Sequence, residues 1–196
     1  VSPLLEAGHY RQSLGLRITG AYPFMEYLAQ YFDITIFYYN PNISPAAEFQ
    51  FRAEEQQRLI REMDLGVSFL LGKYEPERFF SLAKGHEAEP EGGERCFKCY
   101  RLRLEEAARA AKAGGFSYFT TTLSISPHKN AQVLNELGKE ISDAFGVPYL
   151  YSDFKKKNGY RRSCELSTEY HLYRQDYCGC PFSKAEAEER KRRAQA

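Results

Sequence analysis

Several features that assign a chain quickly to a class are absent from this sequence. No run approaches 18 uninterrupted apolar residues, and the N-terminus lacks the basic-then-apolar pattern of a secretory signal, so we expect neither a membrane span nor export. Both common glycine-rich phosphate-binding motifs are absent, which leaves nucleotide binding without a motif. The net charge is only +1, so attraction to nucleic acid must come from local patches. We therefore predict a cytoplasmic protein.

The length and composition predict one domain. At 196 residues with 43% hydrophobic content, the chain can bury one substantial core and is too short for two comfortable domains. We expect a single domain over residues 1–196, with an atypical N-terminal segment at 1–21 and a charged helical tail at 184–196.

Strand-like and helical patterns alternate along the chain. Short apolar or aromatic runs predict strands, and Ala-, Leu- and Glu-rich segments with caps or glycine stops predict helices. This alternation predicts an α/β fold, a Rossmann-like (nucleotide alpha-hydrolase-like) parallel sheet with helices on both faces, plus a C-terminal Cys-containing extension. The predicted strands are 33–40, 67–71, 116–126 and 147–154, and the predicted helices are 44–64, 75–85, 96–113 and 128–146.

In such folds the site lies beyond the carboxyl ends of the strands. Three polar loops follow predicted strands there, and two of them supply substrate-binding candidates, because aromatic rings stack on bases and a helix N-terminus with a lysine receives phosphate. The third carries the densest basic cluster, a candidate for contact with a nucleic-acid backbone. The substrate-binding candidates are Tyr38, Tyr39, Asn42, Ser126, His128 and Lys129, and the candidates for backbone contact, which the resemblance described below assigns to tRNA, are Lys155, Lys156, Lys157, Arg161 and Arg162.

The five cysteines form two pairs and one single residue. Cys96 and Cys99 make a C-x-x-C at the start of a predicted helix, where both sulfurs share one face and the helix N-terminus favours the thiolate. Cys178 and Cys180 are separated by a glycine, which lets both sulfurs turn toward one centre or toward each other. Four thiols suffice for a closed zinc site or an iron-sulfur cluster. Cys164 is interpreted as a buried small hydrophobe.

Five segments together resemble a known family. In order, "FYYNPNI", "RCFKCYRLRLEEAA", "FTTTLSISPHKN", "YLYSDFKKKNGYRRS" and "ELSTEYHLYRQDYCGCPFS" are similar to the epoxyqueuosine reductases of the QueH type, over about residues 24–183. The resemblance implies reduction of epoxyqueuosine to queuosine at the wobble position of tRNA. It also implies a 4Fe-4S cluster, an additional iron ion and an electron donor of unknown identity.

The resemblance also implies roles for the cysteines. The family's cluster ligands match Cys96 and Cys99 and include an N-terminal Cys-Cys pair, while the pair matching Cys178 and Cys180 is a redox disulfide or binds the extra iron. Asp176, beside that pair, is a candidate proton donor with Cys178 and Cys180 in the catalytic set.

The sequence departs from the family pattern at its N-terminus. Residues 1–24 contain no cysteine and no convincing buried-strand pattern, and the family's missing residues fall around 14–19. Two explanations compete: the first strand and its cysteine turn were replaced in a diverged family member, or the metal site is rebuilt from the four paired thiols. A zinc-stabilised tRNA-binding protein without redox activity and an inactive diverged family member are the alternative functions.

Overall fold

A four-stranded parallel sheet forms the centre of the molecule. The structure, a computed structural model, describes residues 12–17, 22–154 and 158–195. The strands lie in the order β3-β2-β1-β4, and every neighbouring pair is parallel. Their bounds are β1 Gln12–Arg17, β2 Phe32–Tyr38, β3 Ser68–Leu71 and β4 Tyr118–Thr121.

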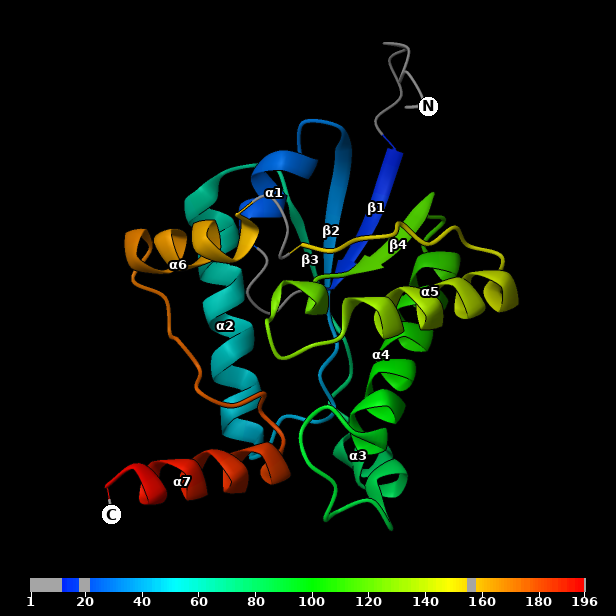
Figure 1. The fold of residues 1–196 in the computed structure, drawn as a ribbon. Helices are drawn as coiled ribbons and strands as arrows, with labels where there is room; N and C mark the ends of the chain where they lie inside the picture. The colour runs from blue at the N-terminus through cyan, green and yellow to red at the C-terminus, as the bar shows by residue number, and fades with distance from the viewer. Residues whose placement is uncertain (1–11, 18–21, 155–157, 196) are drawn as a thin grey trace.

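Helices cover both faces of this sheet (Figure 1). One face packs against α1 and α2, and the other against α4 and α5, in two separate hydrophobic clusters. α6 lies against α1. A 3-10 helix, Leu123–Ile125, follows β4. The helix bounds are α1 Tyr22–Leu28, α2 Ala46–Met63, α3 Pro76–Ala83, α4 Glu94–Ala113, α5 Ala131–Phe145, α6 Gly159–Glu169 and α7 Pro181–Gln195.

The side chains of β2 explain why two layers of helices are needed. Ile34 and Ile36 are almost completely buried in the cluster with α1 and α2, while Phe37 packs against the cluster of α4 and α5. Successive side chains of a strand point to opposite faces of the sheet, so a strand with apolar side chains on both faces needs helices packed on both faces. The prediction of an α/β chain with a parallel sheet is confirmed.

The N-terminal segment contains a strand that its sequence pattern did not predict. β1 is present in the middle of the sheet, with Leu14 opposite Ile34 of β2 and opposite Tyr118 of β4. The segment "QSLGLR" has few apolar residues, so its composition predicts a buried strand poorly. Hydrogen bonding to β2 on one side and β4 on the other forms the strand, although its own residues favour a strand only weakly.

The predicted strand at 147–154 is reduced to one bridge, between Phe119 and Tyr149. Pro148 has no backbone N–H to donate to a ladder. Further along, the backbone N–H and C=O of Ser152 are both taken by the side chain of Asn135, at 3.1 Å each, so this backbone bonds to α5.

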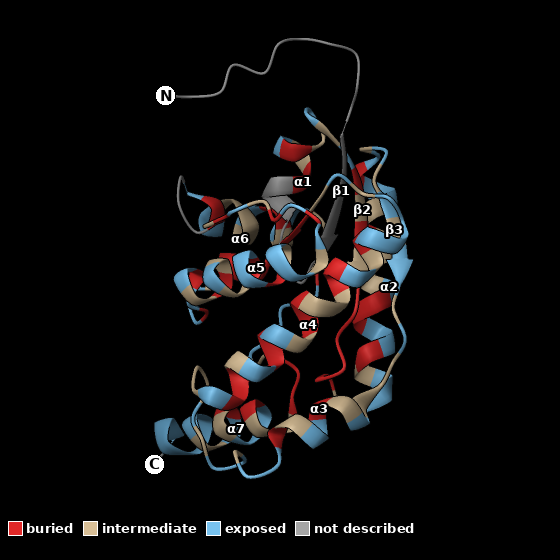
Figure 2. Ribbon diagram, turned by 90° about the vertical axis from the view of Figure 1, so that its right-hand side faces the viewer, coloured by how far each residue is buried: buried red, intermediate tan, exposed pale blue. Residues whose placement is uncertain are grey.

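The carboxyl ends of the strands point toward the middle of the molecule, and α3 and α7 lie beyond them (Figure 1). The loop that leaves β2 is buried over residues 38–43, and Figure 2 shows this buried chain running toward α3 and α7. The backbone N–H and C=O groups of a buried loop need hydrogen-bond partners, so this loop must lie against elements that supply them. Among the residues described, no helix is long and apolar enough to cross a membrane.

Candidate functional site

A cavity of about 370 Å³ opens beyond the carboxyl ends of the strands. Its walls come from α2, α4, α6, the loop after the 3-10 helix and the segment that leads into α7. The four paired cysteines all line it, namely Cys96, Cys99, Cys178 and Cys180. The prediction of a site at this edge of the sheet therefore coincides with the cavity that contains the thiols.

Cys96 and Cys99 lie in the first turns of α4, and both are buried. The backbone N–H of Gly92 donates to the Cys96 sulfur at 3.3 Å. The helix start was expected to favour the thiolate, but burial dominates and raises the pKa of Cys96 despite Gly92, Lys129 and Arg95. A buried thiol of this kind loses its proton when it binds a metal.

The second pair lies in a tight loop before α7. The sulfurs of Cys178 and Cys180 are 3.6 Å apart, and neither forms a disulfide. Gly179 between them has φ +110, a backbone conformation that side chains rarely adopt. Its carbonyl accepts the N–H of Ser44 at 3.0 Å, which ties the loop to the start of α2. Glycine therefore brings both sulfurs to one side.

Ser183, in the first turn of α7, faces both sulfurs. Its hydroxyl lies 3.0 Å from the Cys178 sulfur and 3.4 Å from the Cys180 sulfur, and its backbone N–H donates to Cys180 at 3.3 Å. The hydrogen bond between the sulfurs lowers the pKa of Cys178, with help from Lys129 and Ser183 against burial, and raises the pKa of Cys180. The pair therefore loses its first proton easily, from Cys178, and its second proton with difficulty, from Cys180.

Lys129 is the buried cation of the cavity. Its ammonium group pairs with Glu91 at 2.5 Å and lies 5.9 Å from the centre of the Tyr100 ring. Burial lowers the pKa of Lys129, but the charge of Cys178 and the carboxylate of Glu91 outweigh it and raise the pKa overall. Lys129 was expected to receive a phosphate; the structure shows that it pairs with Glu91, and its charge helps to lower the pKa of Cys178.

Two buried arginines that the sequence analysis did not select hold the thiol segments in place. Arg52 of α2 donates to the side chain of Gln175 and to the carbonyl of Cys178. Arg95 of α4 donates to three carbonyls of the preceding loop, those of His86, Glu87 and Glu89, and to Glu186 of α7. Arg52 shares the buried side of α2 with Phe49, Ala53 and Gln56, a spacing that reveals it.

The substrate-binding candidates separate into two groups. Tyr38, Asn42, Ser126 and His128 line the cavity together with Lys129. Tyr39 does not: its ring stacks on Phe37, and its hydroxyl donates to Glu75 at 3.5 Å. Successive residues of a strand face opposite sides, which places Tyr38 and Tyr39 on different sides of the sheet.

Asp176 and Cys164 also line the cavity. Asp176 forms an ion pair with Lys191 of α7, and this partner lowers the pKa of Asp176. A lowered pKa favours the charged carboxylate, which has no proton to give, so the role of Asp176 as a proton donor stays a prediction. Cys164 is half-buried rather than fully buried, and the guanidinium of Arg174 lies 3.4 Å from its sulfur.

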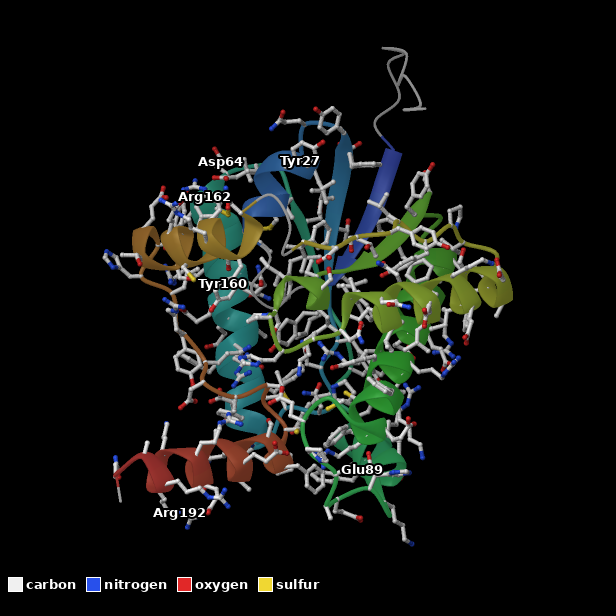
Figure 3. All side chains as sticks on the ribbon, viewed as in Figure 1. Tyr27, Asp64, Glu89, Tyr160, Arg162 and Arg192 are labelled. Carbon is white, nitrogen blue, oxygen red and sulfur yellow. The ribbon has the colours of Figure 1, made fainter. Side chains whose placement is uncertain are left out.

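The basic cluster is only partly covered by the structure. Lys155, Lys156 and Lys157 lie outside the described residues. Arg161 pairs with Glu165 at 3.1 Å, and Arg162 pairs with Glu26 at 3.2 Å. Figure 3 shows Arg162 and Tyr160 on different sides of α6, and Tyr160 is the one that lines the cavity. Both arginines are therefore already next to carboxylates.

The donor atoms are of the type that binds an iron-sulfur cluster, because the four paired cysteines, none of them in a disulfide, line one cavity. Within the described residues no three His, Cys, Asp or Glu side chains are close enough together to hold a single metal ion.

One family model and several known proteins are similar to this chain. The family model "Epoxyqueuosine reductase QueH" matches residues 19–186. Proteins named epoxyqueuosine reductase QueH are 44% identical in Staphylococcus epidermidis, 44% in Streptococcus pyogenes and 35% in Thermotoga maritima. Each alignment covers 81% of this chain, and they cover 69%, 64% and 83% of those relatives. The chain thus spans about two thirds of the first two relatives.

The family match contains the C-x-x-C of α4, the C-x-C before α7 and the loop that carries Lys129. These segments are far apart in the sequence, and the fold brings them to one cavity. The chain belongs to the epoxyqueuosine reductase QueH family.

Proposed function

We propose that this chain reduces the epoxide of epoxyqueuosine to the alkene of queuosine at the wobble position of tRNA, and that the reaction takes place in the cavity beyond the sheet. The observation that carries this proposal is the meeting of two cysteine pairs and the buried Lys129 in one cavity, in a chain of the QueH family. The reaction needs two electrons and two protons and releases the epoxide oxygen as water.

The thiols account for the redox chemistry. Cys96 and Cys99 would hold a 4Fe-4S cluster, which supplies single electrons at low potential when bound. Cys178 and Cys180 either bind an additional iron ion or cycle between dithiol and disulfide. In the second case, forming one S–S bond releases two electrons and two protons, the amounts that the epoxide takes up. Their sulfurs, 3.6 Å apart, need only a short movement to reach bonding distance.

The charged residues of the cavity assist by electrostatics. Lys129 and Ser183 stabilise the thiolate of Cys178, the form in which a thiol reacts. Gly179 and Arg52 keep the sulfurs facing the cavity. Tyr38, Asn42, Ser126 and His128 are the proposed contacts of the modified nucleotide, which must leave the anticodon stack to enter.

The sheet supports the same placement. The order β3-β2-β1-β4 matches one side of the Rossmann strand order, and we infer a Rossmann-like fold of the nucleotide alpha-hydrolase-like type. The crevice for a nucleotide then lies at the carboxyl ends of the strands, where the cavity is.

We propose tRNA and an electron donor as the partners, in the cytoplasm. Residues 155–157, with Arg161 and Arg162, are the proposed contacts of the tRNA backbone. A partner that carries many phosphates can draw an arginine away from a surface carboxylate, because exposed ion pairs contribute only about 0–1 kcal/mol.

The test is conversion of epoxyqueuosine-containing tRNA by the reduced chain after incubation with iron and sulfide, followed by nucleoside mass spectrometry. A second version of the chain carries a Cys-Cys turn restored ahead of Tyr22. Queuosine formed by both versions supports a site built from the four paired thiols. Queuosine formed only after restoration identifies the N-terminal departure as a defect, and none from either version refutes the proposal.

A further inference from the structure

Within the described residues, six of the residues that line the cavity carry a buried polar atom without a hydrogen-bond partner. On α4 these atoms are Nε of Arg95, the hydroxyl of Tyr100 and Nε of Arg103, and on α2 and the loop before it they are Oδ1 of Asn42, Nη2 of Arg52 and Nε2 of Gln56. Asn42, Arg52 and Gln56 are only 2%, 6% and 4% exposed. Buried polar atoms in folded proteins nearly always have a partner, so a cluster of unsatisfied ones along a cavity indicates a ligand that supplies the bonds.

The three residues come from adjoining elements. Asn42 lies in the buried loop after β2, and Arg52 and Gln56 are four residues apart on α2, which places them on one side of that helix. Arg52 is fixed by its other nitrogens: Nε bonds Glu48 at 2.7 Å, and Nη1 lies 3.4 Å from the carbonyl of Cys178. The wall therefore adjoins the C-x-C loop, where the reaction is proposed to occur.

The chemistry of the three atoms selects the ligand. Arg52 and Gln56 offer N–H donors, and Asn42 offers an acceptor. A phosphate has only acceptors to offer and would leave the Asn42 oxygen unpaired. A metal cation is disfavoured by the guanidinium of Arg52. A flat group with a carbonyl next to N–H donors pairs with all three atoms.

The edge of a guanine-type base is such a group, with one carbonyl oxygen beside a ring N–H and an amino group. We propose that Asn42, Arg52 and Gln56 read this edge of the wobble base, with Asn42 accepting from its N–H groups and the other two donating to its carbonyl. This inference rests on the proposed function and deepens it, since it assigns base recognition to α2 and the loop before it. Enzymes that act on a base read its pairing edge in this way once it has left the stack.

The test is binding of anticodon stem-loops that differ only at the wobble position, measured by fluorescence anisotropy at fixed salt. The three RNAs carry guanosine, inosine or 2-aminopurine. Inosine lacks the amino group that faces Asn42, whereas 2-aminopurine lacks the carbonyl that faces Gln56 and Arg52 and also the ring N–H beside it. We expect the chain to bind the guanosine RNA about tenfold more tightly than either analogue, the factor that corresponds to one net hydrogen bond.

Two variants assign the discrimination to residues. Asn42→Leu is expected to abolish the preference over inosine and keep the preference over 2-aminopurine. Gln56→Met is expected to reduce the preference over 2-aminopurine and keep that over inosine. The matched control is Gln50→Met, on the same helix, where the exposed glutamine side chain bonds Glu54 at 2.7 Å; both preferences should remain. A thermal melt of each variant confirms folding.

The outcomes separate the inference from the proposed function. If the unchanged chain binds all three RNAs equally, the inference is overturned while the reductase proposal stands. The same conclusion follows if Asn42→Leu and Gln56→Met fold and keep both preferences. If no stem-loop binds at all, the proposed tRNA substrate is wrong, and base recognition falls with it.

Discussion

Replacing Gly179 with alanine tests whether the C-x-C loop is held as the structure shows. Gly179 has φ +110, and a Cβ atom built there would lie 2.7 Å from Cγ1 of Ile43 and 3.0 Å from Nη1 of Arg52. Both neighbours are buried, and Arg52 is fixed by Glu48. The substitution therefore combines a strained backbone with a steric clash that the surroundings cannot easily relieve.

The magnitude follows from these two effects. A side chain held in a sparsely populated backbone region costs about 1–3 kcal/mol, and overpacking a well-filled site costs about another 1–3 kcal/mol. Gly179→Ala should therefore lower the free energy of unfolding by about 2–6 kcal/mol, measured by urea denaturation of the reduced protein. Where the fold survives, the loop must shift, and epoxyqueuosine reduction should fall because the sulfurs leave their positions.

Gly66→Ala is the matched control. Gly66 also has a positive φ, +68, but no atom lies within 4 Å of the added Cβ. It should lose only the backbone contribution, about 1–2 kcal/mol, and should keep its activity. Equal destabilisation by the two substitutions would refute the packing of Gly179 against Ile43 and Arg52.

Three further predictions concern the supports and the ligands. Arg95→Leu should lower the free energy of unfolding by about 3–5 kcal/mol in urea, because it removes a buried guanidinium that pairs with Glu186 and bonds three carbonyls of the preceding loop, and a loss below about 1 kcal/mol would contradict its role. Cys96→Ser should lower the iron and sulfide bound after reconstitution, whereas Cys164→Ser should not; equal retention by both would show that α4 does not hold the cluster. Changing residues 155–157 to glutamine should weaken the salt dependence of tRNA binding. The slope of the logarithm of the binding constant against the logarithm of the salt concentration should fall by about one for each lysine that contacts a phosphate. Arg162→Gln should reduce it less, because Glu26 already pairs with Arg162, and the reverse order would contradict this assignment.

The sequence predicted the elements whose patterns are strong. The apolar run of β2, the long helix α4 with its glycine stop and the amphipathic α5 all lie where their periodicity indicated. β1 was not predicted because it has few apolar residues, and it forms a strand by pairing with β2 on one side and β4 on the other. The segment at 147–154 has strand-forming residues, yet Pro148 and the bonds from Asn135 take it out of the ladder.

The candidate site could likewise be predicted from the sequence only in part. Both cysteine pairs could be chosen from their spacing, but only the fold places the Cys96 and Cys178 segments in one cavity. The spacing along α2 indicates that Arg52 is buried, but only the fold shows that it bonds the carbonyl of Cys178. Ser183 owes its contact with both sulfurs to the turn at the start of α7, which short-range sequence patterns do not define.

The most direct measurement is queuosine formation from epoxyqueuosine-containing tRNA by the reconstituted, reduced chain, compared with Cys178→Ser, Cys180→Ser and Cys164→Ser. The account predicts that the unchanged chain and Cys164→Ser form queuosine, and that the two C-x-C variants form none although they unfold at the same urea concentration. Queuosine formation by both C-x-C variants at the rate of the unchanged chain would contradict the claim that this cavity and its paired thiols carry out the reduction.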